Sequence, residues 1–264
     1  MSGTGITRTA DANGKDSVNY FEFRRVSKAF DERTVLNQVS FAVKRGETCV
    51  IMGRSGVGKS VALKHIMGFL RADSGQVIVD GEDVTNFTER QFHEVRRKVT
   101  MVFQSGALFD SLSIAENIAF PMMDQPGMTY NDAAAYTEKL ARELEVEDVL
   151  DKVPSELSTG MKRAVAIARA LAAQPQCILY DEPTTMVDPI MSDHLGDLML
   201  RLKRQLQLTS VVVTHDLDLM YKVADRVVFL YEGGVIFFGT VGDLEKSDHP
   251  HIREFLEMDR VVRV

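Results

Sequence analysis

The chain has few cysteines, no long apolar run and no excess of positive charge, and each absence excludes a class of protein. Its two cysteines, Cys49 and Cys177, lie in short apolar runs typical of buried strands, so we expect neither a disulfide nor a CxxC metal site, and we infer a reducing compartment. No run approaches the ~18 to 20 apolar residues of a membrane-spanning helix. Lysine and arginine total 31 against 38 acidic residues, a net charge of −7, so we expect no nucleic-acid partner.

The length and the apolar content predict a compact fold. The 264 residues, of which 45% are apolar, suffice for one large α/β domain or two small ones. Residues 1–18 are rich in Gly, Ser, Thr, Asn and Asp and have no apolar core segment, so we expect a disordered tail and not a signal peptide. The main domain is expected over 19–247, followed by a short C-terminal extension, 248–264, that contains a helix.

The hydrophobic pattern changes along the chain from antiparallel β to α/β. Alternating apolar residues over 21–43 predict an antiparallel sheet, and an apolar strand at 49–52 runs into a glycine-rich loop and a helix at about 59–69. The region 113–173 is almost wholly helical in pattern, which predicts an inserted α-helical subdomain at about 105–165. The remaining strands and helices predict a doubly wound parallel core: 76–79, 100–103, 178–180, 189–207, 211–213 and 227–230.

A phosphate-binding motif follows the strand at 49–52. The pattern G-x-x-x-x-G-K-S needs glycines that let backbone N–H groups turn toward phosphate oxygens, a lysine that neutralises the β and γ phosphates, and a serine that can bind Mg²⁺. The alternative is a glycine-rich connector, but the position between a strand and a helix favours nucleotide binding. The motif comprises Gly53, Arg54, Ser55, Gly56, Val57, Gly58, Lys59 and Ser60.

A pair of carboxylates follows the apolar strand at 177–180. Asp181 and Glu182 would stand at the carboxyl end of that strand, where α/β proteins bind ligands. Asp181 could hold Mg²⁺, directly or through water, and Glu182 could orient and deprotonate the attacking water in phosphoryl transfer. An Asp-Glu pair after a strand is by itself usually a solvated turn, so its value depends on the glycine-rich loop.

Two further polar residues follow strands, and each is weak evidence alone. His215 comes after the strand at 211–213 and could contact the γ-phosphate, although a lone histidine there is more often a local hydrogen-bonding group. Gln104 comes after the strand at 100–103, and a glutamine that opens a loop is usually just solvated. Ser158 precedes a helix with an apolar face, and it is either a simple N-cap or part of a second anion-binding helix N-terminus.

Together these motifs resemble the ATP-binding cassette (ABC) ATPases over roughly residues 20–245. The resemblance implies a P-loop NTPase fold with a RecA-like parallel core, an antiparallel β subdomain and an inserted helical subdomain. It implies ATP and Mg²⁺ as cofactors, with Ser60, Gln104 and Asp181 near the metal. It also implies these roles: Walker A at 53–60, the Q-loop at Gln104, the signature at 157–161 with Ser158, Thr159 and Gly160, Walker B at Asp181-Glu182, the D-loop at Asp188, the switch at His215 and adenine stacking by Phe30.

The family resemblance also implies how the chain assembles. In this family two copies form a head-to-tail dimer, in which the signature of one copy closes over ATP held by the Walker A loop of the other. Closing on ATP and opening after hydrolysis then drive the motion of a partner. Soluble ABC proteins of cofactor assembly are an alternative class.

Three stretches resemble the Mla/Mce type of phospholipid-transport ATPases within this family: 58–66, 103–112 and a signature that ends in Met161. The likeness implies a chain on the cytoplasmic face of the inner membrane, bound to an integral membrane permease and working with an MCE-type lipid-binding protein. An importer of polar solutes is the alternative, because such an ATPase does not touch the cargo. The apolar stretch 103–120, which includes Phe109, would then receive a permease helix, or it simply packs within the helical subdomain.

Three positions depart from the common ABC pattern. Thr159 replaces a signature glycine, which would strain the chain if that position needs a positive φ. Val61 lacks the hydroxyl that usually follows the Walker serine. Met186 stands where the D-loop often has Gly or Ala. Because Lys59, Asp181 and Glu182 remain, we expect a competent and somewhat slow ATPase.

Overall fold

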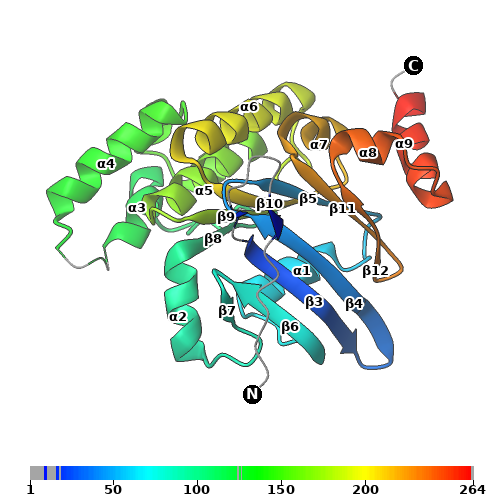
Figure 1. The fold of residues 1–264 in the computed structure, drawn as a ribbon. Coiled ribbons are helices and arrows are strands. Elements are labelled where there is room, and N and C mark those ends of the chain that lie inside the picture. Colours follow the sequence, from blue (N-terminus) through cyan, green and yellow to red (C-terminus); the bar gives the residue numbers. More distant parts are fainter. Residues whose placement is uncertain (1–8, 11–15, 18, 124, 126, 263–264) are drawn as a thin grey trace.

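The protein has two main sheets, with helices packed on both sides of the larger one (Figure 1), and a separate two-stranded sheet near the N-terminus. The computed structural model describes residues 9–10, 16–17, 19–123, 125 and 127–262. Within the predicted tail, β1 (Thr9–Ala10) pairs antiparallel with β2 (Asp16–Ser17), and the other residues of 1–18 lie outside the described ranges. None of the helices in the described ranges combines the length and the hydrophobicity of a transmembrane segment.

The central sheet has six strands in the order β12-β11-β5-β10-β9-β8. All neighbours run parallel except β12, which pairs antiparallel with β11 as a hairpin at the edge. This confirms the expected parallel core, but the assignment of 76–79 to it is wrong, because these residues pair antiparallel with 21–24 in the second sheet. The strands are β5 (Thr48–Met52), β8 (Val99–Val102), β9 (Cys177–Asp181), β10 (Thr209–Val213), β11 (Arg226–Tyr231) and β12 (Gly234–Gly239).

A second, antiparallel sheet of four strands lies below the first in the view of Figure 1. Its order is β4-β3-β6-β7, built mainly from two long paired strands, as the alternation over 21–43 predicted. The strands are β3 (Asn19–Phe30), β4 (Arg33–Lys44), β6 (Ser74–Val79) and β7 (Glu82–Asp83).

Side chains alternate between the two faces of the central sheet along each buried strand, and this alternation divides the core into two layers. In β5, Val50 and Met52 pack with the helical side of the molecule, whereas Cys49 and Ile51 pack against the antiparallel sheet and the helices beside it. Successive side chains of a strand point to opposite faces, so a central strand that is apolar throughout must be covered on both sides. Both faces of this sheet are therefore buried.

Most helices begin at a residue whose side chain can accept a backbone hydrogen bond. Ser113 starts α3 in this way, Thr129 starts α4 and Asp216 starts α7. The helices are α1 (Lys59–Ile66), α2 (Glu89–Lys98), α3 (Ile114–Ala119), α4 (Tyr130–Glu143), α5 (Thr159–Ala172), α6 (Pro189–Leu206), α7 (Leu217–Val223), α8 (Val241–Glu245) and α9 (Pro250–Val262), with 3₁₀ turns η1 (Phe120–Met122), η2 (Glu147–Val149) and η3 (Pro154–Glu156).

The helix predicted over 59–69 ends earlier, at Ile66. Gly68 has a φ of +70°, and the backbone N–H of Phe69 donates to the carbonyl of Lys64. A glycine in the left-handed conformation just past the last turn stops a helix. The prediction missed this stop because the apolar pattern continues through Phe69.

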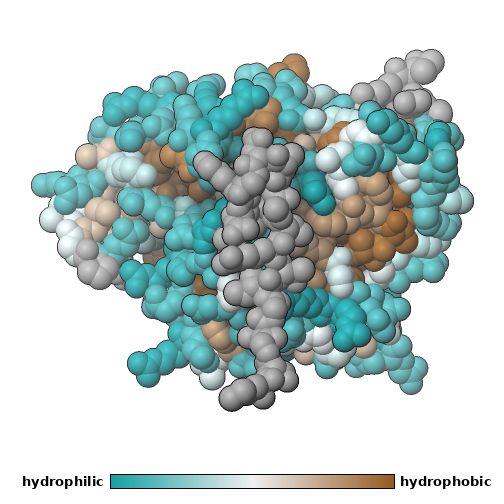
Figure 2. All heavy atoms as spheres, in the orientation of Figure 1, coloured by the Kyte–Doolittle hydropathy of each residue, from teal (hydrophilic) through white to brown (hydrophobic). Residues whose placement is uncertain are grey.

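The C-terminal extension confirms the expected helix, which is α9. Its Phe255 ring packs edge-on against Phe229 of β11 at 5.1 Å between centroids, and His251 stacks on Tyr231 at 3.8 Å. In the view of Figure 2, apolar residues gather over the neighbouring β11–β12 hairpin, whose outer strand is half-buried along its whole length.

Candidate active site

The glycine-rich loop connects the end of β5 to the start of α1, and two of its glycines are required by the backbone. Gly53 has a φ of +145° and Gly58 a φ of +104°. A Cβ on Gly53 would lie 2.5 Å from the carbonyl oxygen of Leu230, and one on Gly58 would lie 2.7 Å from that of Val35. Gly58 is also the N-cap of α1 and offers no side-chain cap, so the first N–H groups of α1 are left for a ligand.

Lys59 lies beneath this loop with only 6% of its surface exposed. Its Nζ donates to the carbonyl oxygens of Gly53 at 2.9 Å and Arg54 at 3.2 Å, and it lies 3.4 Å from Oε1 of Glu182. The ammonium group therefore stands between the loop that would hold phosphates and a carboxylate from a distant part of the chain.

Ser60 and Asp181 meet although they are far apart in the sequence. The hydroxyl of Ser60 donates to Oδ1 of Asp181 at 2.7 Å. Burial raises the pKa of Asp181, as does the nearby charge of Glu182, whereas the Ser60 hydrogen bond and the charges of Lys64 and Lys59 oppose the rise. A hydroxyl beside a carboxylate supplies the hard oxygen donors that Mg²⁺ prefers.

Glu182 follows β9 in a left-handed conformation, with a φ of +49°, and its N–H donates to the carbonyl of Val213 in β10. Its carboxylate accepts from Thr185 Oγ1 at 3.2 Å and lies 2.8 Å from Nδ1 of His215, both at Oε2. A non-glycine residue with positive φ is strained. The strand end and the loop hold this carboxylate toward the cleft despite that cost.

Most of the predicted nucleotide residues line one cleft of about 600 Å³. Asp181 is not among the lining residues, but it is hydrogen-bonded to Ser60, which is. Among the described residues, no three His, Cys, Asp or Glu side chains form a metal site by themselves. The predicted residues that line the cleft are Arg54, Ser55, Gly56, Gly58, Lys59, Ser60, Gln104, Glu182 and His215.

Four further residues line the cleft: Val61, noted above only for the hydroxyl that it lacks, and Val35, Thr185 and Phe255, which sequence reasoning missed. Thr185 could have been found as a hydroxyl three residues after Glu182. Phe255 comes from α9, whose Glu254 pairs with Arg54 of the loop at 2.7 Å. No sequence pattern placed the C-terminal helix beside this loop.

Phe30, the predicted adenine-stacking residue, is not among the described residues that line the cleft. It ends β3 with 41% of its surface exposed, and the ammonium of Lys28 lies 5.5 Å from the centroid of its ring. An exposed aromatic ring at this edge remains able to stack on a flat ligand.

The signature residues lie outside the cleft formed by their own chain. Ser158 accepts a hydrogen bond from the N–H of Met161 and so caps α5. Thr159 is the first residue of that helix and is not among the described residues with positive φ, so the strain considered for it is absent. Asp188 likewise caps α6 by accepting from the N–H of Met191.

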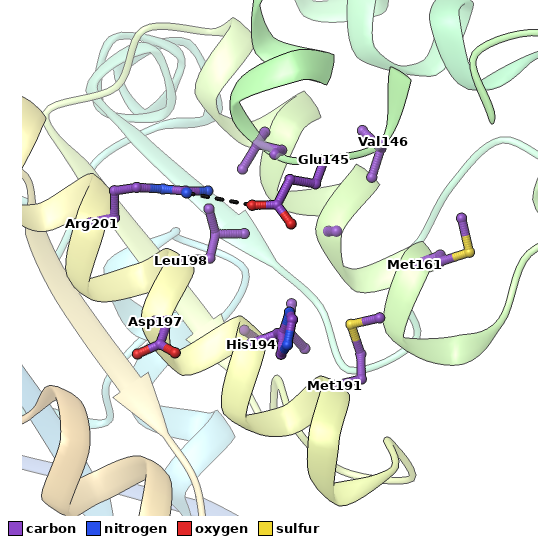
Figure 3. A pocket seen from close by; sticks show the side chains of 11 residues that line it. Glu145, Val146, Met161, Met191, His194, Asp197, Leu198 and Arg201 are labelled. Atoms are coloured by element: carbon purple, nitrogen blue, oxygen red, sulfur yellow. Dashed lines mark ion pairs between the residues drawn. The ribbon is translucent and has the colours of Figure 1, made fainter. Parts of the chain in front are cut away.

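The start of α6 packs directly on the signature helix. Met191 lies so close to Gly160 that a Cβ there would be 2.1 Å from the Met191 Cγ. Figure 3 shows Met161 and Met191 at one end of a small hollow of about 330 Å³ between α5 and α6, with the ion pair of Glu145 and Arg201 at the other. Gly160 is thus required for helix packing.

We expect Gly160→Ala to destabilise the protein by about 1 kcal/mol. The added methyl must displace Met191, which typically costs about 1–3 kcal/mol in a packed site, against a helix-propensity gain of about 0.5–1 kcal/mol. Chemical denaturation measures the change. The matched test is Gly160→Ala in a Met191→Ala background, where the methyl has room and should raise stability. Equal destabilisation in both backgrounds would contradict this packing argument.

Met186, unlike Thr159, has the strained backbone conformation of a non-glycine residue with positive φ. Its φ is +61°, and 87% of its surface is exposed. The left-handed conformation destabilises a residue that has a Cβ by roughly 1–2 kcal/mol, and substitution by glycine removes this strain. Glycine also has more conformational freedom in the unfolded chain, which cancels about half of that gain. We therefore expect Met186→Gly to raise the free energy of unfolding by about 0.5–1 kcal/mol in nucleotide-free protein. Met186→Ala, which keeps the Cβ, should leave stability unchanged, and a gain as large as that of the glycine variant would contradict the strain.

A family model described as ABC transporter matches residues 36–185. The chain belongs to this family. The MlaF intermembrane phospholipid transport ATP-binding protein of Haemophilus influenzae is 35% identical over 93% of this chain and 94% of its own length. A probable ribonucleotide transport ATP-binding protein of Mycobacterium tuberculosis is 32% identical over 91% of this chain and 67% of its own length.

The fold agrees with solved ABC structures. One is a dimeric ATP-binding cassette in a post-hydrolysis state, bound to ADP and phosphate. It superposes on this chain with a TM-score of 0.77 and 29% sequence identity, and the match covers 84% of this chain and 98% of the cassette chain. As an ABC protein, the chain binds and hydrolyses ATP, and the P-loop NTPase architecture expected from the sequence is confirmed.

Proposed function

We propose that this ABC protein powers phospholipid transport across the bacterial cell envelope through a membrane permease. The observation that supports ATP hydrolysis at this site is that Lys59, Ser60 and Glu182 line one cleft and that Asp181 is hydrogen-bonded to Ser60. The phospholipid assignment is supported by the likeness to MlaF, which extends over 94% of that protein.

In the proposed site, the chain's own residues bind and orient the triphosphate. The Nζ of Lys59, now on the carbonyls of Gly53 and Arg54, is placed to neutralise the terminal phosphates. Ser60 and Asp181 fit Mg²⁺, because a buried carboxylate and a hydroxyl already share a 2.7 Å hydrogen bond there, and Gln104 would complete the set. Bound Mg²⁺ neutralises charge on the phosphates.

Glu182 is the proposed general base. Its carboxylate faces the cleft, and as an ionised acceptor it can take a proton from a water molecule that attacks the γ-phosphate. His215 is 2.8 Å from that carboxylate and is proposed to orient it and to contact the γ-phosphate. The exposed His215 ring leaves a second nitrogen for that contact.

The proposed active form is a head-to-tail dimer of two copies. Ser158, Thr159 and Gly160 do not line the cleft of their own chain among the described residues, so their proposed contact with phosphate requires a second copy. The dimeric ADP-bound relative supports this arrangement. Asp188 and an adenine-stacking Phe30 belong to the same proposal.

The proposed membrane partner is an integral permease on the cytoplasmic face of the inner membrane, working with an MCE-type lipid-binding protein. Two exposed aromatic rings support a docking surface: Phe109 is 43% exposed, Phe120 is 48% exposed, and their centroids lie 4.6 Å apart. Exposed aromatic clusters of this kind are typical of protein interfaces.

We expect Phe109→Asp to lower recovery of the permease with the tagged chain at least 30-fold, because a charge would enter the apolar centre of the interface. ATP affinity should stay within about threefold, since Phe109 is not among the residues that line the cleft. Leu206→Asp, at an exposed apolar position at the end of α6, serves as the control and should have no effect. Normal recovery of the Phe109 variant would refute docking at this surface.

An importer of polar solutes is the second candidate, favoured by the mycobacterial relative named for ribonucleotide transport. The purified complex, reconstituted in vesicles, should transfer fluorescent phospholipid in the presence of ATP and should ignore ribonucleotides. Uptake of ribonucleotide without lipid transfer would support the alternative. ATPase activity without any membrane partner in the source cells would favour a role in cofactor assembly.

A further inference from the structure

The carboxylate of Asp216 joins three segments of the chain beside the proposed active site. Its Oδ2 accepts from the hydroxyl of Thr184 at 2.9 Å and from that of Ser192 at 3.4 Å, and its Oδ1 accepts from the N–H of Leu219 at 3.1 Å. Thr184 lies in the loop after β9, Ser192 in the first turn of α6, and Asp216 directly follows His215. One side chain that is not among the described residues lining the cleft therefore connects the loop of the proposed base to the loop of the switch histidine.

Capping of α7 does not by itself account for this arrangement. A cap needs one acceptor oxygen, and Oδ1 of Asp216 supplies it to Leu219. Oδ2 instead bonds to Thr184, 32 residues away in the sequence. A carboxylate is a stronger acceptor than a neutral oxygen. The second oxygen thus serves the contact between the two loops.

Glu182 needs such a contact because its own backbone is strained. Its φ is +49°, and a non-glycine residue keeps a left-handed conformation only where the surrounding structure over-determines it. Two links to the neighbouring loop involve Glu182 itself: its N–H donates to the carbonyl of Val213, and its Oε2 lies 2.8 Å from Nδ1 of His215. The bond between Thr184 and Asp216 adds a third link between the same two loops, one residue beyond His215.

Both ends of this third link are well fixed. Thr184 is only 8% exposed, and it belongs to the same turn as Glu182, because the N–H of Thr185 donates to the carbonyl of Glu182 at 3.3 Å. On the other loop, the N–H of Asp216 donates to the hydroxyl of Thr214, a fully buried residue, at 3.0 Å. A displacement of Thr184 would therefore reach Glu182 through the turn that they share.

We propose that Thr184 and Asp216 are positioning residues for ATP hydrolysis. Their hydrogen bond keeps Glu182 in its strained conformation and beside His215, so that the carboxylate stays aimed at the water that attacks the γ-phosphate. Neither residue touches the reacting atoms. The inference rests on the proposed function, because it presumes that Glu182 is the general base. A shift of about 1 Å in a catalytic group can lower a rate about 100-fold, so a bond of this kind affects turnover without contributing to ATP binding.

Thr184→Val tests the inference, because it removes the hydroxyl but keeps the size and the branching of the side chain. The cap of α7 stays intact. We expect kcat for ATP hydrolysis to fall about 10-fold, because Glu182 can then relax out of the position that proton transfer requires. The affinity for ATP, measured by calorimetry, should stay within about threefold, since the groups that face the phosphates are unchanged. Thr184→Ser keeps the hydroxyl and should restore kcat to within about twofold of the wild type.

Thr137→Val is the matched control. Thr137 lies in α4 and is 3% exposed, and its hydroxyl has no hydrogen-bond partner among the described residues. The substitution makes the same chemical change at an equally buried position, so kcat should not change. A loss of kcat as large as that of Thr184→Val would show an effect of burial in general and would contradict the proposed link.

The background of Glu182→Gln separates positioning from a general structural role. The residual hydrolysis of that variant does not use the base, so adding Thr184→Val should lower it no further, as single-turnover release of radiolabelled phosphate would measure. An equal fold-loss in both backgrounds, or a loss of ATP affinity as large as the loss of kcat, would overturn the positioning role.

The remaining outcomes distinguish this inference from the proposed function. Wild-type kcat in folded Thr184→Val, while Glu182→Gln loses turnover, would overturn the inference alone, whereas wild-type turnover by Glu182→Gln would overturn the proposed base and the inference with it. If Thr184→Val does not fold, judged by thermal melting, Asp216→Asn replaces it, because the amide keeps the capping oxygen and exchanges the charged acceptor for a neutral group. Its kcat should fall at least about threefold at unchanged ATP affinity, and wild-type kcat would overturn the inference.

Discussion

Glu182→Gln is expected to lower kcat for ATP hydrolysis about 10²- to 10⁴-fold, the usual contribution of a general base. The amide keeps the size of the side chain and can still bond to His215, which lies 2.8 Å away, but it cannot accept a proton from water. The affinity for ATP should therefore change little. Release of inorganic phosphate measures the rate, and calorimetry measures the affinity.

Glu145→Gln is the matched control for that variant. Glu145 also has a positive φ and an ionic partner, Arg201 at 3.5 Å, but it lies beside the hollow between α5 and α6. Its neutralisation should leave turnover unchanged. Wild-type turnover by the Glu182 variant would remove the proposed base from the mechanism.

Lys59→Ala is expected to weaken ATP binding about 100-fold. A charge-assisted hydrogen bond contributes about 1.5–3 kcal/mol, and the ammonium group of Lys59 is placed to form such bonds with the phosphates. A loss of this size corresponds to a weakening of ATP binding of about 100-fold. Glu182 would also lose the cation that lies 3.4 Å from it, so its repulsion of the triphosphate would rise. Titration with a fluorescent ATP analogue measures the loss.

Lys64→Ala controls for net charge. It removes the same charge from the same helix, but Lys64 is exposed and does not line the cleft. Its affinity for ATP should remain within a few-fold of the wild type. Equal losses in the two variants would show that a general electrostatic field, not the position of Lys59 under the loop, holds the nucleotide.

The parts of the fold that depend on local periodicity could be predicted from the sequence. Strands such as β5 and β9 are apolar at nearly every position and are followed by polar or glycine residues, so both their place in a parallel sheet and the edge that carries the site could be predicted. For this reason the amino-acid pattern alone predicts that Lys59, Asp181 and Glu182 meet at one edge of the sheet.

The parts that depend on tertiary packing could not be predicted. The contact of Met191 with Gly160 joins the starts of two helices, and the pairing of Arg54 with Glu254 brings α9 beside the glycine-rich loop. Neither contact leaves a periodic signal, because each is decided by where elements dock after they form. The strain at Met186 is similar, since side-chain identity alone does not reveal a positive φ.

Calorimetric titration of Glu182→Gln with ATP tests the central claim most directly, because this variant should bind the nucleotide without consuming it. The account predicts saturable heat in the presence of Mg²⁺, a weaker interaction when EDTA removes the metal, and loss of binding when Lys59→Ala is added. Absence of heat with ATP and Mg²⁺ in a folded protein would contradict the convergence of these residues on one nucleotide.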